Sequence, residues 1–161
     1  MRMPTHARME YIDFTNTAPA VATALRALSK AVDDAGLDKS LTELIKLRAS
    51  QINGCAFCVQ FHLNAARGLG VDQRKLDLVA AWRDAGIFSA REQAALAWTE
   101  ALTKLSAESA SDAVYAQVAG QFPAGELAHL SAAIANINAW NRIAVGLRFS
   151  PPAPAQPRSA A

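Results

Sequence analysis

The two cysteines of this chain lie close together, and a histidine follows them directly. Cys55 and Cys58 form a Cys-x-x-Cys pair, and His62 lies four residues after Cys58. The chain has no other cysteine, so all of its thiol chemistry is concentrated in residues 54–62. Two thiols beside an imidazole can bind a metal, form a structural disulfide or act as a redox dithiol. These three interpretations, and a buried pair without chemistry, are the alternatives.

A helix that starts near residue 56 would bring these side chains together. Gly54 ends the preceding segment, and Cys58 then falls in the first turn of a helix over about 56–69. Unpaired backbone N–H groups and the helix dipole favour negative charge there, so we expect a lowered pKa for the Cys58 thiol. His62 lies one turn further on the same face, and Cys55 is within disulfide reach. The stretch can therefore supply a nucleophile, a resolving thiol and a proton carrier, the groups that reduction of a peroxide requires.

A zinc site or a thioredoxin-type site explains the pattern less well. Two cysteines and one histidine provide three ligands, and structural zinc usually takes a second Cys or His pair. His6 and His129 are single residues far away in the chain. A thioredoxin-type motif would need a surrounding βαβ pattern, and no such pattern is present. We therefore expect no metal site, and we give neither of these histidines a role.

The rest of the chain has the apolar spacing of helices, with no alternating strand pattern. Ser89 and Glu92 form a capping box, and Asp72 is a candidate N-cap. The predicted helices cover about residues 17–36, 41–53, 56–69, 72–86, 89–105, 111–121 and 127–144. In the last of them Asn141 falls within the apolar spacing. The sequence predicts an all-α fold, a helical bundle of six or seven helices.

Composition limits the classes of function. The chain has 161 residues and a net charge of +2, with no basic run, so we expect no nucleic-acid partner. No apolar run reaches the roughly 18 residues that a membrane span requires, and no secretory signal is evident. We expect a cytoplasmic protein with one domain over residues 1–149. Residues 150–161 are rich in proline and alanine and are expected to form a disordered tail.

A wider motif surrounds the cysteines and identifies a related family. Glu43, Cys55-Ala-Phe-Cys58 and His62 follow the pattern E-x11-C-x2-C-x3-H. This pattern resembles that of the alkylhydroperoxidase AhpD family, in the carboxymuconolactone decarboxylase-like superfamily. Residues 43–70, 92–103 and 134–148 also resemble the helices of that family. The resemblance implies an AhpD-like helical bundle that assembles into homo-oligomers, often trimers or hexamers.

The resemblance also implies an activity and roles for the four motif residues. It implies antioxidant reduction of hydrogen peroxide or small organic hydroperoxides, without a metal or an organic cofactor. Cys58 would be the attacking thiol, and Cys55 the resolving thiol that is exposed to the reductant. His62 and Glu43 would form a proton relay. The electrons would come from an external dithiol such as a lipoyl group on a dehydrogenase subunit, and a peroxiredoxin would be a partner.

Three points of the sequence leave alternatives open. Some relatives carry a histidine between the cysteines where this chain has Phe57, which implies a different proton relay. Ser40 and Glu43 also match a capping box, and spacing alone favours that role for Glu43. Trp140 is a candidate to line the site.

A non-enzymatic redox-sensing or assembly protein is an alternative function, and a lactone decarboxylase-type enzyme is a weaker one, because that branch typically lacks the cysteine pair.

Overall fold

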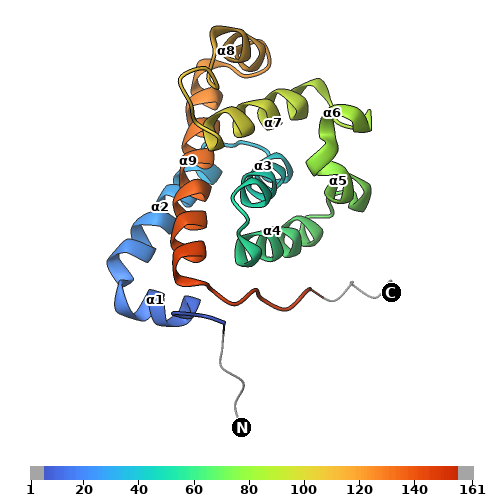
Figure 1. Ribbon diagram of the computed structural model, residues 1–161. Helices are drawn as coiled ribbons and strands as arrows, with labels where there is room; N and C mark the ends of the chain where they lie inside the picture. The colour runs from blue at the N-terminus through green and yellow to red at the C-terminus, as the bar shows by residue number, and fades with distance from the viewer. Residues whose placement is uncertain (1–5, 156–161) are drawn as a thin grey trace.

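The structure, a computed structural model, describes residues 6–155 of the chain. This part folds into nine α-helices and one short 3₁₀-helix, and it contains no strand, which confirms the all-α prediction. Figure 1 shows the arrangement. The helices are α1 (Tyr11–Thr17), α2 (Pro19–Asp34), α3 (Lys39–Ile52), α4 (Ala56–Gly68), α5 (Gln73–Leu78), η1 (Val79–Ala81), α6 (Trp82–Ala85), α7 (Ala90–Thr103), α8 (Asp112–Ala119) and α9 (Ala124–Leu147).

Helix α3 lies at the centre of the molecule (Figure 1) and packs against α4, α7 and α9. Leu44, Ile45 and Leu47 point to different sides of this helix, yet each is at most 1% exposed. A helix that is enclosed on most sides buries apolar residues around most of its circumference. Helix α3 is therefore a rigid support for the polar residues that it also carries, Glu43 and Lys46.

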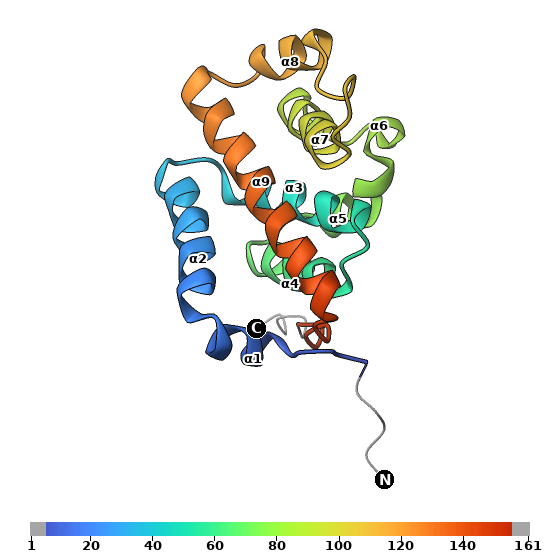
Figure 2. The same ribbon diagram turned by 60° about the vertical axis from the view of Figure 1, so that its left-hand side comes forward.

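The long helix α9 connects the two ends of the bundle. Figure 2 shows α9 crossing α3 and α4, with α2 along its other side, and these helices are all in contact with it. Leu130, Ile134 and Ile137 form its buried face, as the apolar spacing predicts. Its C-terminal half brings Trp140 and Asn141 close to the start of α4. Neither α9 nor any other helix in the described part of the chain is long and apolar enough to cross a membrane.

Two parts of the helix prediction differ from the structure. The segment predicted as one helix over 72–86 is divided into α5, η1 and α6, although Asp72 caps α5 as expected. Leu76, Val79 and Trp82 are all buried and lie three residues apart, which matches the three residues per turn of a 3₁₀-helix. Helix α1 was not predicted because it is short and buries only Phe14.

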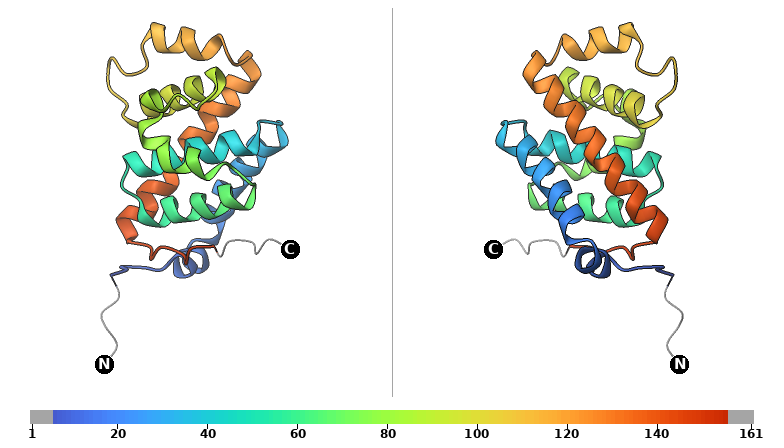
Figure 3. Two further views of the ribbon diagram at one scale, coloured as in Figure 1. Left: turned by 90° about the vertical axis from the view of Figure 1, so that its right-hand side faces the viewer. Right: turned by 90° about the vertical axis from the view of Figure 1, so that its left-hand side faces the viewer.

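The segments on either side of the helical bundle are attached to its lower end, where both lie in Figure 3. The N–H groups of Arg8 and Met9 donate to the carbonyl of Leu147. The Asn64 side chain donates to the carbonyl of Ala153 at 2.9 Å and accepts from the N–H of Ala155 at 2.8 Å. The first part of the expected tail, residues 150–155, is thus bonded to α4, whereas 156–161 lie outside the described residues.

The capping box at the start of α7 is present as predicted. The Glu92 N–H donates to Ser89 Oγ at 3.1 Å, and the Ser89 N–H donates to Glu92 Oε2 at 2.8 Å. We expect Ser89→Ala to lower the free energy of unfolding by about 1 kcal/mol, because one helix N–H loses its acceptor. Urea denaturation measures the change. Ser106→Ala is the control, since no hydrogen bond is made by that hydroxyl to a described residue; an equal loss in both variants would contradict the prediction.

Candidate active site

The two thiols lie at the junction of α3 and α4. Gly54 has a φ of 65°, a left-handed conformation that lets the chain turn sharply between the two helices. Cys55 is then the N-cap of α4, and its Sγ accepts a hydrogen bond from the Cys58 N–H at 3.2 Å. Both cysteines are free thiols, and they are 1% and 3% exposed. The burial of Cys55 differs from the exposed resolving thiol that the resemblance implies.

The thiol with the lowered pKa is Cys55, the N-cap of α4, rather than Cys58. Hydrogen bonds from the Cys58 thiol and, against the effect of burial, from the Cys58 backbone lower the pKa of Cys55 from 9.0 to about 7. The same contact with Cys55, together with burial and the negative charge of its thiolate, raises the pKa of Cys58. The predicted lowering at Cys58 is therefore wrong, because the Cys58 thiol donates its hydrogen bond to Cys55 and is buried beside it. Near pH 7 the pair is therefore partly ionised, and its negative charge is held mainly by Cys55.

Asn141 is a third polar group at the thiol pair. It is fully buried, its amide nitrogen donates to Ser50 Oγ at 3.0 Å, and its carbonyl oxygen accepts from Asn53 at 2.9 Å. Hydrogen bonding from Asn141 also contributes to lowering the pKa of both thiols. Sequence reasoning gave Asn141 no role. Its position within an otherwise apolar helix face was the signal that could have identified it.

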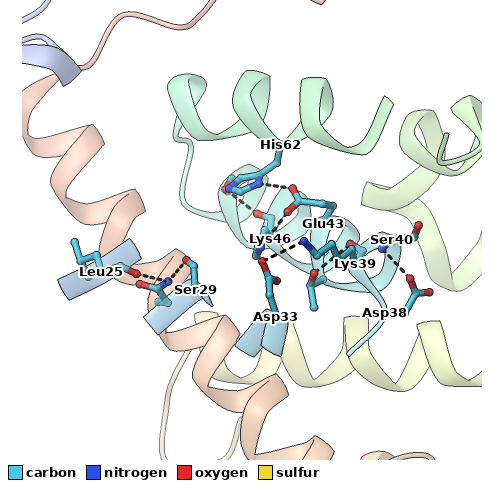
Figure 4. Close-up of polar contacts among 12 residues, drawn as sticks. Leu25, Ser29, Asp33, Asp38, Lys39, Ser40, Glu43, Lys46 and His62 are labelled. Atoms are coloured by element: carbon cyan, nitrogen blue, oxygen red, sulfur yellow. Dashed lines mark hydrogen bonds and ion pairs between the residues drawn. The ribbon is translucent and has the colours of Figure 1, made fainter. Parts of the chain in front are cut away.

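Glu43 and His62 form a second pair beside the thiols. His62 Nδ1 lies 2.6 Å from one carboxylate oxygen of Glu43, and Lys46 Nζ lies 3.0 Å from the other. Figure 4 shows Glu43 between these two partners. Burial acts to raise the pKa of Glu43, but the hydrogen bonds and positive charges of His62 and Lys46 outweigh it, so that its pKa is lowered. Glu43 is therefore ionised at neutral pH and holds the imidazole from its Nδ1 side.

The capping interpretation of Glu43 is wrong. Helix α3 begins at Lys39, and its N-cap is Asp38, whose carboxylate accepts from the Ser40 N–H at 2.9 Å. Glu43 is the fifth residue of the helix, beyond the reach of a capping box. Its carboxylate is directed instead at α4, where it meets His62.

A cavity of about 330 Å³ is lined in part by Glu43, Cys58 and His62. Cys58 and His62 line it, whereas Cys55 does not, so Cys58 is the thiol that a bound molecule can meet. The expectation that Trp140 lines the site is confirmed. The full lining consists of Tyr11, Arg26, Ser29, Glu43, Lys46, Phe57, Cys58, Phe61, His62, Asn136, Ile137 and Trp140.

Phe57, the residue between the cysteines, belongs to the aromatic wall of this cavity. Its ring is stacked with those of Tyr11 and Phe61, with centroids 5.3 and 6.1 Å away, and it meets Phe149 edge to face at 5.3 Å. Phe57 therefore attaches α1 and the segment after α9 to the start of α4. The position between the two cysteines is therefore occupied by an apolar side chain packed among aromatic rings.

Neither Arg48 nor His129 lines the cavity. Arg48 pairs with Glu100 at 2.9 Å, and Arg83 shares the same carboxylate, so Arg48 has a structural role. His129 bonds the carbonyl of Gly125 within its own helix. Among residues 6–155, no group of three or more His, Cys, Asp or Glu side chains is placed to hold a metal ion.

Titration of the thiols tests the electrostatics of the pair. We expect one thiolate to form with a midpoint near pH 7, because the pKa of Cys55 is lowered to about 7. Since the thiolate is the deprotonated form, its ultraviolet absorbance rises with pH through this midpoint. Cys55→Ser should abolish the step, because the thiol that remains is Cys58. Two thiols that both titrate near their ordinary value would contradict this arrangement.

The model of the "Carboxymuconolactone decarboxylase family" matches residues 19–101, just over half of the chain, and this range includes Glu43, both cysteines and His62. A solved structure from Agrobacterium tumefaciens, of a protein of unknown function described as a candidate antioxidant defence protein AhpD, is similar with 36% identity and a TM-score of 0.85. The similarity covers 91% of this chain and 99% of that one.

Two further relatives are more distant. The uncharacterized protein YdfG of Bacillus subtilis is 29% identical over 136 residues, which cover 84% of this chain and 92% of YdfG. A peroxidase-related protein of Ralstonia eutropha, described as an alkylhydroperoxidase AhpD core, is 25% identical with a TM-score of 0.76. That similarity covers 87% of this chain and 75% of the other.

Proposed function

Since this chain belongs to the carboxymuconolactone decarboxylase family and to its AhpD-like members, we propose that it is a thiol-dependent peroxidase. Its substrates are hydrogen peroxide or small organic hydroperoxides, and its reductant is an external dithiol. The observation that carries this proposal is the position of the Cys58 thiol. Cys58 lines a cavity together with His62, and its thiol is hydrogen-bonded to that of Cys55, which does not line the cavity. Metal and organic cofactors have no part in the proposed reaction.

In the first step Cys58 attacks the terminal oxygen of the hydroperoxide. The proton of Cys58 passes to the Cys55 thiolate, with which it is hydrogen-bonded. The new S–O bond gives a sulfenic acid on Cys58, and the O–O bond breaks. The leaving alkoxide, or hydroxide in the case of hydrogen peroxide, takes a proton from His62, which the Glu43 carboxylate holds in position.

In the second step Cys55 acts as the resolving thiol. Its sulfur displaces the hydroxyl of the Cys58 sulfenic acid, which leaves as water and takes the Cys55 proton with it. The two residues are separated by one helical turn, so a disulfide is within reach. One hydroperoxide is thereby reduced to an alcohol and water, and two thiols are oxidised to one disulfide.

An external dithiol then restores the two cysteines by thiol–disulfide exchange. Cys58 lines the cavity and Cys55 does not, so in this proposal the reductant attacks the sulfur of Cys58 through the cavity. A lipoyl group on a partner protein has the size and the dithiol that this step requires. Assembly into trimers or hexamers, a peroxiredoxin partner and a cytoplasmic location stay predictions.

A redox-sensing protein is the second candidate. The observation that favours it is that Cys55 caps α4 through its sulfur, so a disulfide would change the start of that helix. Both functions require reversible oxidation, but only the enzyme turns over repeatedly.

Peroxide consumption by the reduced protein with excess dihydrolipoamide separates the two functions. The proposal predicts that many equivalents of hydrogen peroxide or cumene hydroperoxide are consumed per protein, with dithiol oxidised in equal amount. If fully reduced protein with titratable thiols consumes one equivalent and then stops with each of several dithiols, the peroxidase proposal is wrong and the redox-sensing function is favoured.

A further inference from the structure

The cavity in front of Cys58 is larger than its simplest substrate requires. Its volume is about 330 Å³, whereas a water molecule takes up about 30 Å³ of the liquid and hydrogen peroxide is only slightly larger. Four aromatic side chains, those of Tyr11, Phe57, Phe61 and Trp140, form much of its lining. Phe61 is half exposed, and a solvent-exposed aromatic ring at a cavity is a surface that an apolar ligand would cover. The walls therefore fit an organic molecule.

The charged groups of the lining are unequal in number. Besides His62, two basic side chains, Arg26 and Lys46, line the cavity together with one carboxylate, that of Glu43. Glu43 pairs with both Lys46 and His62, so Arg26 is the basic side chain of the lining that pairs with no carboxylate there. Organic molecules that carry a negative charge are therefore favoured over neutral ones.

Arg26 contacts Tyr11 of the aromatic lining, and its guanidinium has further N–H groups that a ligand can accept from. One of its terminal nitrogens donates to the Tyr11 hydroxyl at 2.7 Å, and the guanidinium lies 5.9 Å from the centre of that ring. Among residues 6–155 no carboxylate forms an ion pair with Arg26. A guanidinium has five N–H groups in a planar fork, which matches the two oxygens of a carboxylate.

We propose that the cavity selects organic hydroperoxides that carry a carboxylate, with the carboxylate on Arg26, the hydrocarbon against the aromatic wall and the hydroperoxide at Cys58. The inference rests on the proposed peroxidase function and adds a substrate class to it. The reaction is unchanged: the O–O bond breaks, Cys58 is oxidised and the substrate leaves as the hydroxy acid. Arg26 and Tyr11 determine specificity in this proposal and take no part in the chemistry.

A matched pair of substrates tests the proposal. Cumene hydroperoxide and its 4-carboxy derivative share a hydrocarbon frame and differ by one carboxylate. We expect kcat/KM of the wild-type protein to be about fivefold higher or more for the carboxylate substrate, the scale of one charge pair near the surface. Arg26→Leu should reduce the ratio of the two kcat/KM values to about one, and added salt should reduce it in the wild-type protein.

Arg74→Leu is the matched control. It removes the same charge from α5, and Arg74 does not line the cavity, so the ratio should keep its wild-type value. Arg26→Lys keeps the charge without the planar fork and should give an intermediate ratio. A wild-type ratio near one, or a ratio that Arg26→Leu leaves unchanged, overturns the inference while the peroxidase function stands.

A binding measurement separates failure of the inference from failure of the function. Calorimetric titration of the reduced protein with 4-isopropylbenzoate and with the neutral 4-isopropylbenzamide needs no turnover. We expect the benzoate to bind more tightly, and Arg26→Leu to remove the difference. If no hydroperoxide is consumed but this difference is present, the peroxidase proposal is wrong and carboxylate recognition at Arg26 stands. If the two ligands bind equally, the inference is wrong whatever the turnover.

Discussion

Replacing Cys58 with serine is expected to abolish catalytic peroxide consumption, with a loss of about 10³-fold or more. A serine hydroxyl is far less acidic than a thiol, and its oxygen cannot form the sulfenic acid that conserves the oxidation. Cys58 is also the thiol that lines the cavity, so Cys55 behind it has no direct access to the substrate. The measurement is the steady-state rate with hydrogen peroxide and excess dihydrolipoamide.

Cys55→Ser is the control that distinguishes the two thiols. This variant keeps the attacking thiol and loses the resolving one, so we expect a single equivalent of peroxide to be consumed. The product is a sulfenic acid on Cys58 that a dimedone label and mass spectrometry identify. Turnover that survives in Cys58→Ser, or a sulfenic acid found on Cys55 in that variant, would reverse the roles. The lowered pKa of Cys55 is the physical reason to make this comparison.

Replacing Glu43 with glutamine is expected to lower kcat/KM for hydrogen peroxide by about 10²-fold, at the lower end of what general acid–base catalysis contributes. The carboxylate holds His62 Nδ1 at 2.6 Å and so orients the imidazole that gives a proton to the leaving oxygen. Glutamine has nearly the same shape but no charge. Because the pKa of Glu43 is lowered, the carboxylate acts throughout the neutral range and is lost only when the pH falls through that lowered pKa.

Two comparisons separate this catalytic role from a structural one. Glu126→Gln removes a carboxylate from a more exposed ion pair with Arg91, and we expect its kcat/KM to match the wild-type value. The ellipticity of Glu43→Gln at 222 nm should also equal that of the wild-type protein, because Asp38 rather than Glu43 caps α3. Unchanged kcat/KM in Glu43→Gln would remove Glu43 and its hydrogen bond from the mechanism.

Local sequence patterns predicted much of the helical framework. These patterns are the proline at the start of α2, the Asp72 and Ser89 caps and the apolar spacing of α9. Each depends only on residues a few positions apart, so it can be recognised in the sequence. The division of the 72–86 segment could not be read in this way. It depends on which side of each short helix faces the core, and that is decided by contacts with distant residues.

The motif itself contained part of the candidate site. The four-residue spacing of Cys58 and His62 places both on one face of α4, and both line the same cavity. The family pattern added Glu43, whose contact with His62 is made across two helices. Spacing within α3 favoured a cap for this residue, because a capping box is a local pattern and a contact between helices is not.

The sequence by itself determined most of the longer helices, the reactive residue types and the face of α4 that carries Cys58 and His62, because these follow from a period of 3.6 residues and from caps a few residues apart. Only the tertiary structure decided which thiol holds the charge, that Asn141 lies beside it, and that Arg26 and Tyr11 share a cavity with Cys58. These features depend on contacts between helices far apart in the chain and on burial, which changes the energy of a charge without changing the spacing of the residues.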